Sequence, residues 1–374
     1  MRFLLGILAL LLLIVIAGAF YEYFEVTSWS RASPPGRSVR VNGIATHIYC
    51  AGKESPTVVL VSGLGDDWSS WGFVLHDVAV ITRVCAYDRA GLGWSAASPA
   101  ARTSRNIAAE LEATLEAAGE KGPYILVGHS IGGLHIREYQ AQHPDKVVGM
   151  LFVDSSCPGQ NQRVPEWQAG LATERRQLKI SAWLSYIGEP RISGSCTSLP
   201  PNYPAQFRDA ALATGKRSCD STTLRTILSE LDSFGESQEE VSRDSKSLDS
   251  LPVTVISHDP DKPIADLSPE INRRTEAIWA DIQTELTQLS SRGKHLVAKG
   301  SGHYVQVDRP DLVVSSIHDL VEKSRQQPVV TSPLCSFDLS NQFSKSVMAE
   351  SGPTITNIIF HYFCVLQEGT EATV

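Results

Sequence analysis

The stretch YILVGHSIGGLHIREY, residues 124–139, decides the fold. It begins as a continuous apolar run and ends in an amphipathic pattern, which predicts a buried strand that leads directly into a helix. Between the two patterns lies Gly128-His129-Ser130-Ile131-Gly132. A turn this tight needs glycines on both sides of the serine, because those positions tolerate almost no side chain. We therefore expect Ser130 at the tip of a strand-to-helix turn.

The pattern Gly128-x-Ser130-x-Gly132 in this context is typical of a nucleophile elbow. In such a turn the serine is strained and its hydroxyl is exposed above the sheet. The helix that follows offers free N–H groups and the positive end of its dipole, which favour an oxyanion. The N–H of Ile131 is one candidate donor. The alternative is a chance occurrence of the pattern in a strand–helix turn.

A serine needs a neighbouring base to act as a nucleophile at neutral pH. Of the ten histidines, His303 stands out, because it follows the last expected strand in the glycine-containing loop KGSGHYVQVDRP. In a parallel sheet such loops emerge at the same edge as the serine. We interpret His129, His135 and His143 as packing residues.

A second oxyanion donor is expected in the loop Ser62-Gly63-Leu64-Gly65-Asp66, which follows the apolar run TVVLV. Glycines there let the backbone approach a substrate closely. The N–H of Leu64 is our choice. The alternative is a glycine-rich turn with no chemical role.

Short β-type runs alternate with helical patterns along most of the chain. The runs are mostly continuous in apolar residues, as strands buried on both faces are. Helices are expected at 104–119, where Ile107, Leu111 and Leu115 recur at four-residue spacing, and near 270–290 and 310–324. This alternation predicts an α/β fold, a mostly parallel twisted sheet with helices on both faces.

The alternation stops after Ser155, and the residues that follow are rich in serine, proline and charge. We expect an α/β core at 39–156 and 251–325, an inserted helical cap at 157–250, and an irregular tail at 326–374. Several apolar residues of the cap either line an acyl pocket or join the cap to the core. They are Trp167, Leu171, Leu178, Ile180, Trp183 and Leu184.

Residues 3–20 carry no charge, and this length reaches the threshold for a membrane-spanning helix. Residues 1–25 are therefore expected to form a single membrane anchor, joined to the core by a linker at 26–38. Arg2 precedes the apolar run, which places the N-terminus in the cytoplasm and the body outside or in a lumen. The alternative is a secreted protein, because Ala17-Gly18-Ala19 resembles a signal cleavage site.

The chain has 374 residues, of which 42% are hydrophobic, and a formal net charge of −8. This balance and the lack of basic blocks argue against nucleic acid as a partner. The seven cysteines include no CxxC pair, and nothing indicates a metal or a cofactor. Cys196 and Cys219 bracket a proline-rich loop and a short helix, and they either form a disulfide or remain thiols.

Four motifs, LVSGLG, AYDRAGLGWS, VGHSIGG and GSGHYVQVDRP, occur in an order that resembles the α/β-hydrolase superfamily over about residues 39–325. The resemblance is closest to membrane-anchored members that begin with an apolar helix. It implies an α/β-hydrolase fold and a serine esterase with a Ser-His-Asp triad, in which Ser130 is the nucleophile and His303 the base.

The resemblance leaves the acid of the triad open. Family members most often carry it after the seventh strand, where this chain reads SHDPDKP, with His258 in place of the usual glycine and Asp261 at the acid position. The other family position is the end of the sixth strand, where Asp154 stands. We favour Asp154, with Asp261 as the alternative and Asp259 third.

The expected reaction is cleavage of a carboxylic ester or related acyl bond of a small, lipophilic substrate. Haloalkane dehalogenases and epoxide hydrolases of this superfamily use an aspartate at the elbow, and this chain has Ser130 there. Perhydrolysis and C–C bond hydrolysis use the same triad and remain open. A catalytically idle, membrane-tethered binding protein on the same fold is the alternative from another class.

Overall fold

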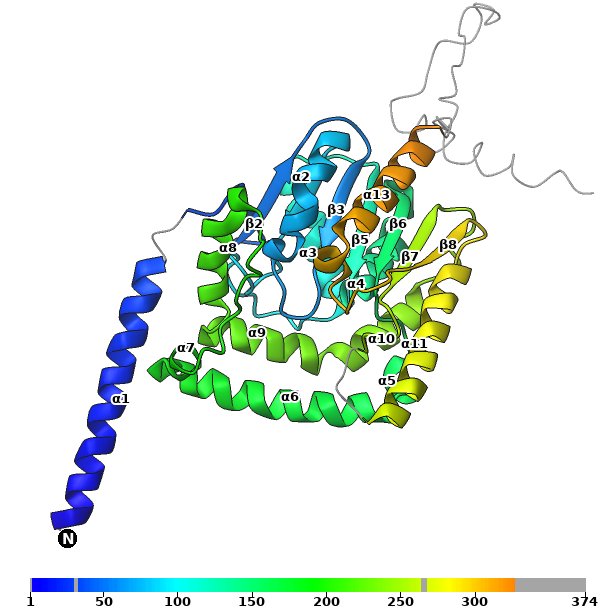
Figure 1. The fold of residues 1–374 in the computed structure, drawn as a ribbon. Coiled ribbons are helices and arrows are strands. Elements are labelled where there is room, and N and C mark those ends of the chain that lie inside the picture. The colour runs from blue at the N-terminus through cyan, green and yellow to red at the C-terminus, as the bar shows by residue number, and fades with distance from the viewer. Residues whose placement is uncertain (1, 30–32, 264–267, 327–374) are drawn as a thin grey trace, which may run out of the picture. The chain divides into compact units, whose positions relative to one another are not determined.

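The computed structural model describes residues 2–29, 33–263 and 268–326, and its body is an eight-stranded sheet in the order β1-β2-β4-β3-β5-β6-β7-β8 (Figure 1). All neighbours from β4 to β8 pair in parallel, whereas β1 and β2 pair antiparallel to their neighbours. The strands are β1 Arg37–Val41, β2 Ile44–Ala51, β3 Thr57–Val61, β4 Val84–Tyr87, β5 Tyr124–His129, β6 Val147–Val153, β7 Val253–Ser257 and β8 Gly293–Val297. The predicted fold class is confirmed.

Helices cover both faces of the sheet (Figure 1). One face packs against α2 (Gly72–Ile81) and α13 (Pro310–Arg325), and the other against α3 (Ser104–Ala117), α4 (Gly132–Gln142) and α11 (Pro269–Gln288). The central strands β3, β4, β5 and β7 are buried along their whole length, which explains why they read as continuous apolar runs.

The first β-type run of the sequence, VRVNGIATHIYC at residues 39–50, forms a hairpin of two strands. β1 and β2 are joined by Asn42-Gly43, and both residues have positive φ, 51° and 83°. Asn-Gly with two positive φ values is the preferred two-residue hairpin turn, because its twist matches that of the flanking strands. On its other side β2 pairs with β4, where Cys50 lies directly opposite Cys85, and the two form a disulfide.

The segment between β6 and β7 forms the inserted helical cap. Its long helix α6 packs beside α9, and both lie near the edge of the sheet at which β5 and β6 end (Figure 1). A second disulfide, Cys196–Cys219, joins the loop after α7 to the turn between α8 and α9. The cap helices are α5 Gln160–Arg163, α6 Pro165–Leu184, η3 Ser185–Ile187, α7 Glu189–Ile192, α8 Ala205–Arg217, α9 Ser221–Asp232 and α10 Phe234–Asp244.

The N-terminal apolar segment is a helix, α1 (Arg2–Trp29), long and apolar enough to cross a membrane. It continues four residues beyond the expected boundary at residue 25, and β1 begins inside the expected linker 26–38. The tail 327–374, with Cys335 and Cys364, lies outside the described residues. The remaining short helices are η1 Trp68–Trp71, η2 Pro144–Lys146 and α12 Val305–Asp308.

Replacing Cys196 and Cys219 together by serine should lower the free energy of unfolding by about 3 kcal/mol, because the bridge closes a loop of 23 residues. Unfolding of the oxidised wild-type chain and of the oxidised double variant, in which Cys50–Cys85 stays intact, gives the difference. Equal stabilities, with free thiols found at both positions by peptide mapping, would contradict the bridge.

Candidate active site

The turn after β5 holds Ser130 in the left-handed region, with φ of 53°, and leaves it half-buried. A Cβ atom added at Gly128 would lie 2.7 Å from the backbone of Gly132, and one added at Gly132 would collide with the carbonyl of Val61. Both glycines are therefore required by close backbone approach, as the pattern predicts. A non-glycine residue with this φ costs energy, and such strain is common at functional sites.

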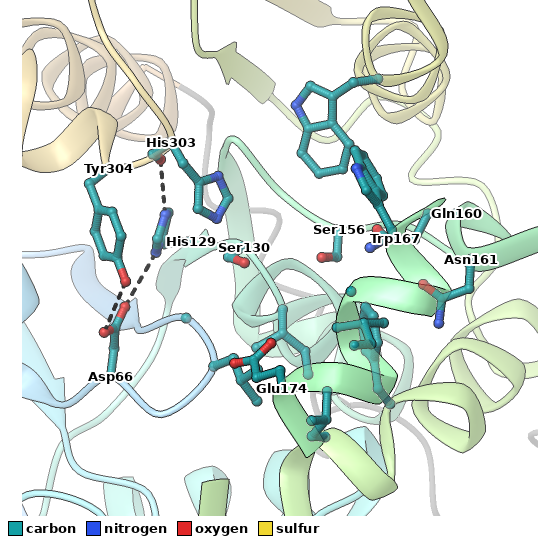
Figure 2. A pocket seen from close by; sticks show the side chains of 18 of the residues that line it. Asp66, His129, Ser130, Ser156, Gln160, Asn161, Trp167, Glu174, His303 and Tyr304 are labelled. Atoms are coloured by element: carbon teal, nitrogen blue, oxygen red, sulfur yellow. Dashed lines mark hydrogen bonds and ion pairs between the residues drawn. The ribbon is translucent and has the colours of Figure 1, made fainter. Parts of the chain in front are cut away.

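His303 follows β8 in a short loop that returns over the end of β5. Its Nδ1 lies 2.6 Å from Oδ2 of Asp154, so the ring donates this N–H to the carboxylate. Ser130 and His303 line the same cavity, and Figure 2 shows the His303 ring beside the Ser130 hydroxyl. The structure thus brings together three of the five side chains that the sequence suggested for the triad.

Asp154 stands at the first position after β6, with φ of 45° and no exposed surface. Besides His303, its carboxylate accepts the Nε1–H of Trp279 at 2.8 Å and the backbone N–H of His258 at 3.0 Å. Burial alone would raise the pKa of this carboxyl, but the hydrogen bonds from His258 and His303 hold it well below its usual range. Asp154 is therefore a fixed, ionised acceptor.

The other two candidate acids lie elsewhere in the loop after β7. Asp261 is exposed, and its backbone N–H donates to Oδ1 of Asp259 at 3.2 Å. Asp259 itself accepts the N–H of Gly300 at 2.8 Å and pairs with Lys299. Within the described residues, Asp154 is the carboxylate that contacts the imidazole of His303, while Asp259 fastens the loop that carries it.

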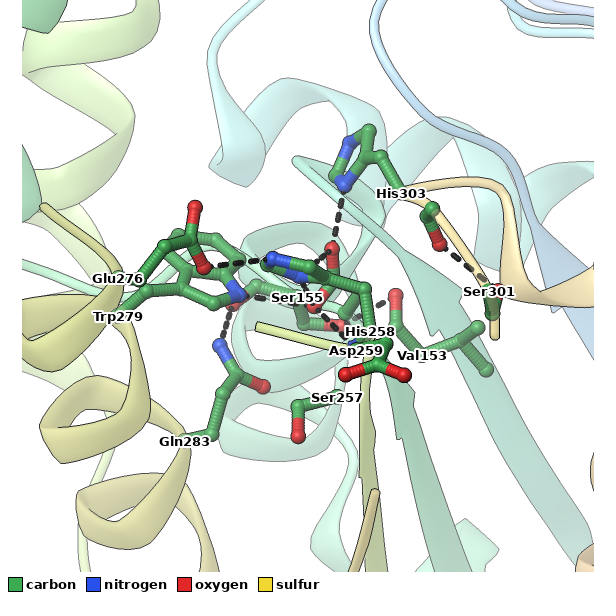
Figure 3. Close-up of polar contacts among 12 residues, drawn as sticks. Val153, Ser155, Ser257, His258, Asp259, Glu276, Trp279, Gln283, Ser301 and His303 are labelled. Carbon is green, nitrogen blue, oxygen red and sulfur yellow. Dashed lines mark hydrogen bonds and ion pairs between the residues drawn. The ribbon is translucent and has the colours of Figure 1, made fainter. Parts of the chain in front are cut away.

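His258 is a site residue that the sequence reasoning missed. Its Nδ1 lies 2.9 and 3.0 Å from the two carboxylate oxygens of Asp154, and its Nε2 lies 2.7 Å from Glu276 of α11 (Figure 3). Burial would lower the pKa of this imidazole, but the two carboxylates raise it to about 10. The available signal was the histidine at the position where the resembling family has a glycine.

The two candidate oxyanion donors flank the cavity beside Ser130. Leu64 and Ile131 both line it, and in the described part of the chain neither backbone N–H donates to a protein acceptor. Leu64 packs against the apolar cluster that contains Ile131 and Phe234, which fixes the loop after β3 against the elbow. Two free N–H groups at a helix N-terminus and a neighbouring loop are the arrangement that stabilises an oxyanion.

A buried arginine holds the loop after β3 in place. Arg89 donates to the carbonyls of Ser62 and Gly63 at 2.8 and 2.6 Å. Its other N–H groups reach the carboxylate of Glu230, on cap helix α9, at 2.6 and 2.9 Å. Glu230 also accepts the N–H of Gly65 at 3.1 Å. One ion pair therefore joins the cap, the loop and the sheet.

The histidines interpreted as packing residues are placed in that way. His129 is buried beneath the site, and its Nε2–H reaches the carbonyl of His303 at 3.1 Å. Its ring lies 4.8 Å from that of His303 and 5.0 Å from that of Tyr304. Burial lowers the pKa of His129, so the neutral ring supports the loop of His303. His135 is hydrogen-bonded to Ser104, and His143 packs on Tyr139.

The cavity above Ser130 has a volume of about 410 Å³ and lies between the sheet edge and the cap. Its walls are partly apolar, and Trp167 and Leu171 contribute from the cap as expected, whereas Ile180 and Trp183 are exposed on the protein surface. Asp66 and Glu174 also line it (Figure 2), as does Glu166. Such a mixed lining suits a small organic molecule.

Residues 58–316, more than half of the chain, match the family model described as Alpha/beta hydrolase family. The chain belongs to this family. Membership supports a hydrolase acting on a small molecule as the general activity. A relative from Gibberella zeae, named an AB hydrolase superfamily protein, is 28% identical over 300 residues, which cover 73% of this chain and 88% of the relative.

Solved structures of the same fold include enzymes of different specificity. A thermophilic esterase from Thermogutta terrifontis aligns with a TM-score of 0.52 at 19% identity, over 77% of this chain and 98% of the esterase. A haloalkane dehalogenase from Agrobacterium tumefaciens aligns with a TM-score of 0.57 at 14% identity, over 77% of this chain and 96% of the dehalogenase. These likenesses show the fold, and the chemistry must be argued from the site.

Substituting Glu230→Gln should destabilise the fold by about 3–5 kcal/mol, because it leaves the guanidinium of Arg89 buried without a counter-charge. Thermal unfolding followed by circular dichroism measures the change. Glu239→Gln is the matched control, since Glu239 is exposed on α10 and its loss should cost less than about 0.5 kcal/mol. Similar losses in both variants would show that the effect does not come from the Arg89 pair.

Proposed function

We propose that the chain is a serine hydrolase that cleaves a carboxylic ester or a related acyl bond through a Ser130-His303-Asp154 triad. The observation that carries this proposal is the 2.6 Å hydrogen bond between Asp154 and His303, in a loop that presents His303 to the cavity beside Ser130. The strained turn at Ser130 and the free N–H groups next to it support the same chemistry.

In the proposed mechanism Ser130 attacks the carbonyl carbon, while Nε2 of His303 removes the hydroxyl proton. Asp154 accepts the Nδ1–H, which keeps the ring in the required tautomer and stabilises the imidazolium that forms. The N–H groups of Leu64 and Ile131 receive the negative charge of the carbonyl oxygen. His303 then protonates the leaving alcohol, and water releases the acyl group from Ser130 by the same steps.

A serine at the elbow favours acyl transfer over the other chemistries known on this fold. Displacement of a halide or opening of an epoxide proceeds through an aspartate at the elbow in the resembling families, and here the residue is Ser130. Perhydrolysis and C–C bond cleavage need the same groups and remain alternatives. An idle binding protein is disfavoured, because Ser130 and His303 line one cavity and Asp154 is hydrogen-bonded to His303.

The cavity favours a small, lipophilic and uncharged substrate. Leu171, Leu231 and Phe234 offer apolar contacts to an acyl chain. The carboxyl groups of Glu174 and Asp66 line the same space. Carboxylates at this position repel an anionic substrate such as a free acid, so a neutral ester is the proposed class.

We propose that α1 anchors the protein in a membrane with its body on the extracytoplasmic or lumenal side. The helix is apolar over a membrane-spanning length, and the positive Arg2 precedes it. The disulfides Cys50–Cys85 and Cys196–Cys219 fit an oxidising compartment. A secreted body, released by cleavage after Ala19, is the alternative.

Ser130→Ala should reduce the hydrolysis of short p-nitrophenyl esters by at least about 10³-fold and abolish labelling by a fluorophosphonate probe. The thermal midpoint should stay close to that of the wild type. Ser156→Ala is the matched control, because Ser156 lines the same cavity but has no proposed role in the reaction. Activity retained above a few per cent in Ser130→Ala would overturn the assignment of the nucleophile.

Asp154→Asn should lower turnover by about 10⁴-fold, because the amide neither fixes the tautomer of His303 nor stabilises the imidazolium. Asp261→Asn should change turnover little, since that side chain is exposed in the loop after β7. Steady-state rates of the two folded variants on one ester provide the comparison. The reverse order of the two effects would assign the acid to Asp261.

A further inference from the structure

A second ion pair lies behind the proposed triad and plays no part in the mechanism above. His258, at the end of β7, is 1% exposed, and Glu276 of α11 is 8% exposed. Each ring nitrogen of His258 lies within 3.0 Å of a carboxylate oxygen, Nδ1 facing Asp154 and Nε2 facing Glu276. An ionised carboxylate only accepts hydrogen bonds, so both ring nitrogens must carry a proton. His258 is therefore an imidazolium between two carboxylates.

We propose that the His258–Glu276 pair is a positioning device that holds Asp154 and sets the pH range in which His303 acts as a base. This inference rests on the proposed function. His258 fixes the carboxylate through its ring and through its backbone N–H, so that Oδ2 stays directed at His303. Its positive charge partly neutralises Asp154, and Glu276 in turn balances His258.

The three side chains Glu276, His258 and Asp154 form a row of alternating negative and positive charge. Glu276, His258 and Asp154 together carry a net charge of −1. This net charge acts electrostatically on His303, which contacts Asp154 directly. A more negative set stabilises the protonated form of His303, so the base becomes available only at higher pH. A less negative set has the opposite effect. Removing one member should therefore move the acid limb of the pH–rate profile in a direction that depends on which charge is lost.

Other groups around His303 are left unchanged by such substitutions. The neutral His129 at the end of β5 lies beneath the ring, and Tyr304 packs beside it. Asp66 of the loop after β3 accepts the Tyr304 hydroxyl at 3.4 Å, and Glu174 of α6 faces the same cavity. These groups belong to other elements than β7 and α11, so they provide a constant background against which the pair is tested.

The test compares pH profiles of kcat/KM for a neutral p-nitrophenyl ester, using the full-length chain in detergent. His258→Gln leaves two carboxylates, and its acid limb should move up by about one pH unit. Glu276→Gln leaves one positive and one negative charge, and its limb should move down by about the same amount. In the double variant the net charge returns to −1, and the limb should return close to its wild-type position.

A merely structural role would lower the rate at every pH without moving the limb, and that result would overturn the proposal. Shifts of the two single variants in the same direction would also overturn it. Ser130→Ala serves as the reference for the proposed function. Residual activity in that variant would refute the proposed function, whereas unmoved limbs combined with an inactive Ser130→Ala chain would refute this inference alone.

If the variants fold poorly, the proposal can be tested on a protein that keeps His258, Asp154 and Glu276 unchanged. Nitrogen-15 spectra of labelled histidines should show an imidazolium that persists at pH 9. His47 also faces oxygen acceptors with both ring nitrogens, Asp88 and the carbonyl of Pro35, so a His47→Gln chain removes its signal. One remaining imidazolium at pH 9 is expected from His258, and its absence would overturn the proposal.

Discussion

A buried carboxylate is the constraint on which the site depends. Asp154 has no exposed surface, and an ionised carboxylate in that position is tolerated only when its oxygens are occupied by donors. The donors come from His258 at the end of β7, Trp279 in α11 and His303 after β8. The three donors are each more than 100 residues away from Asp154 in the sequence. They meet it because they lie at the carboxyl edge of the same sheet or on the helix beside that edge.

Most of the fold was predictable because it follows from local patterns. Glycines flank Ser130 at the end of the apolar run, because a Cβ at Gly128 would meet the backbone of Gly132 and one at Gly132 would meet the carbonyl of Val61. His303 was predictable because loops after parallel strands share an edge of the sheet. The carboxylate partner of His303 was harder to predict, since Asp154 and Asp261 both follow strands. What separates them is the set of donors around Asp154, which come from the segments after β7 and β8 and from α11.

The partners in contacts between distant segments could not be predicted from this one sequence. Arg89 and Glu230 are 141 residues apart, and each resembles an ordinary charged residue of a loop or a helix. The disulfide Cys50–Cys85 depends on the register in which β2 pairs with β4, and two strands that are distant in sequence carry no local sign of that register. His258 stood in the printed sequence as a departure from the family pattern, but its role appears only once Glu276 is placed beside it.

The ion pair of Arg89 and Glu230 has a consequence for how new specificities can arise on this scaffold. The cap enters and leaves the core between β6 and β7, so a foreign cap is simple to splice in at the level of chain connectivity. Yet Glu230 sits on the cap while the loop that it holds through Arg89 belongs to the core. A transplanted cap that lacks a carboxylate at this point would leave a buried cation behind. Recombination of caps between relatives is thus restricted to donors that carry the matching acid.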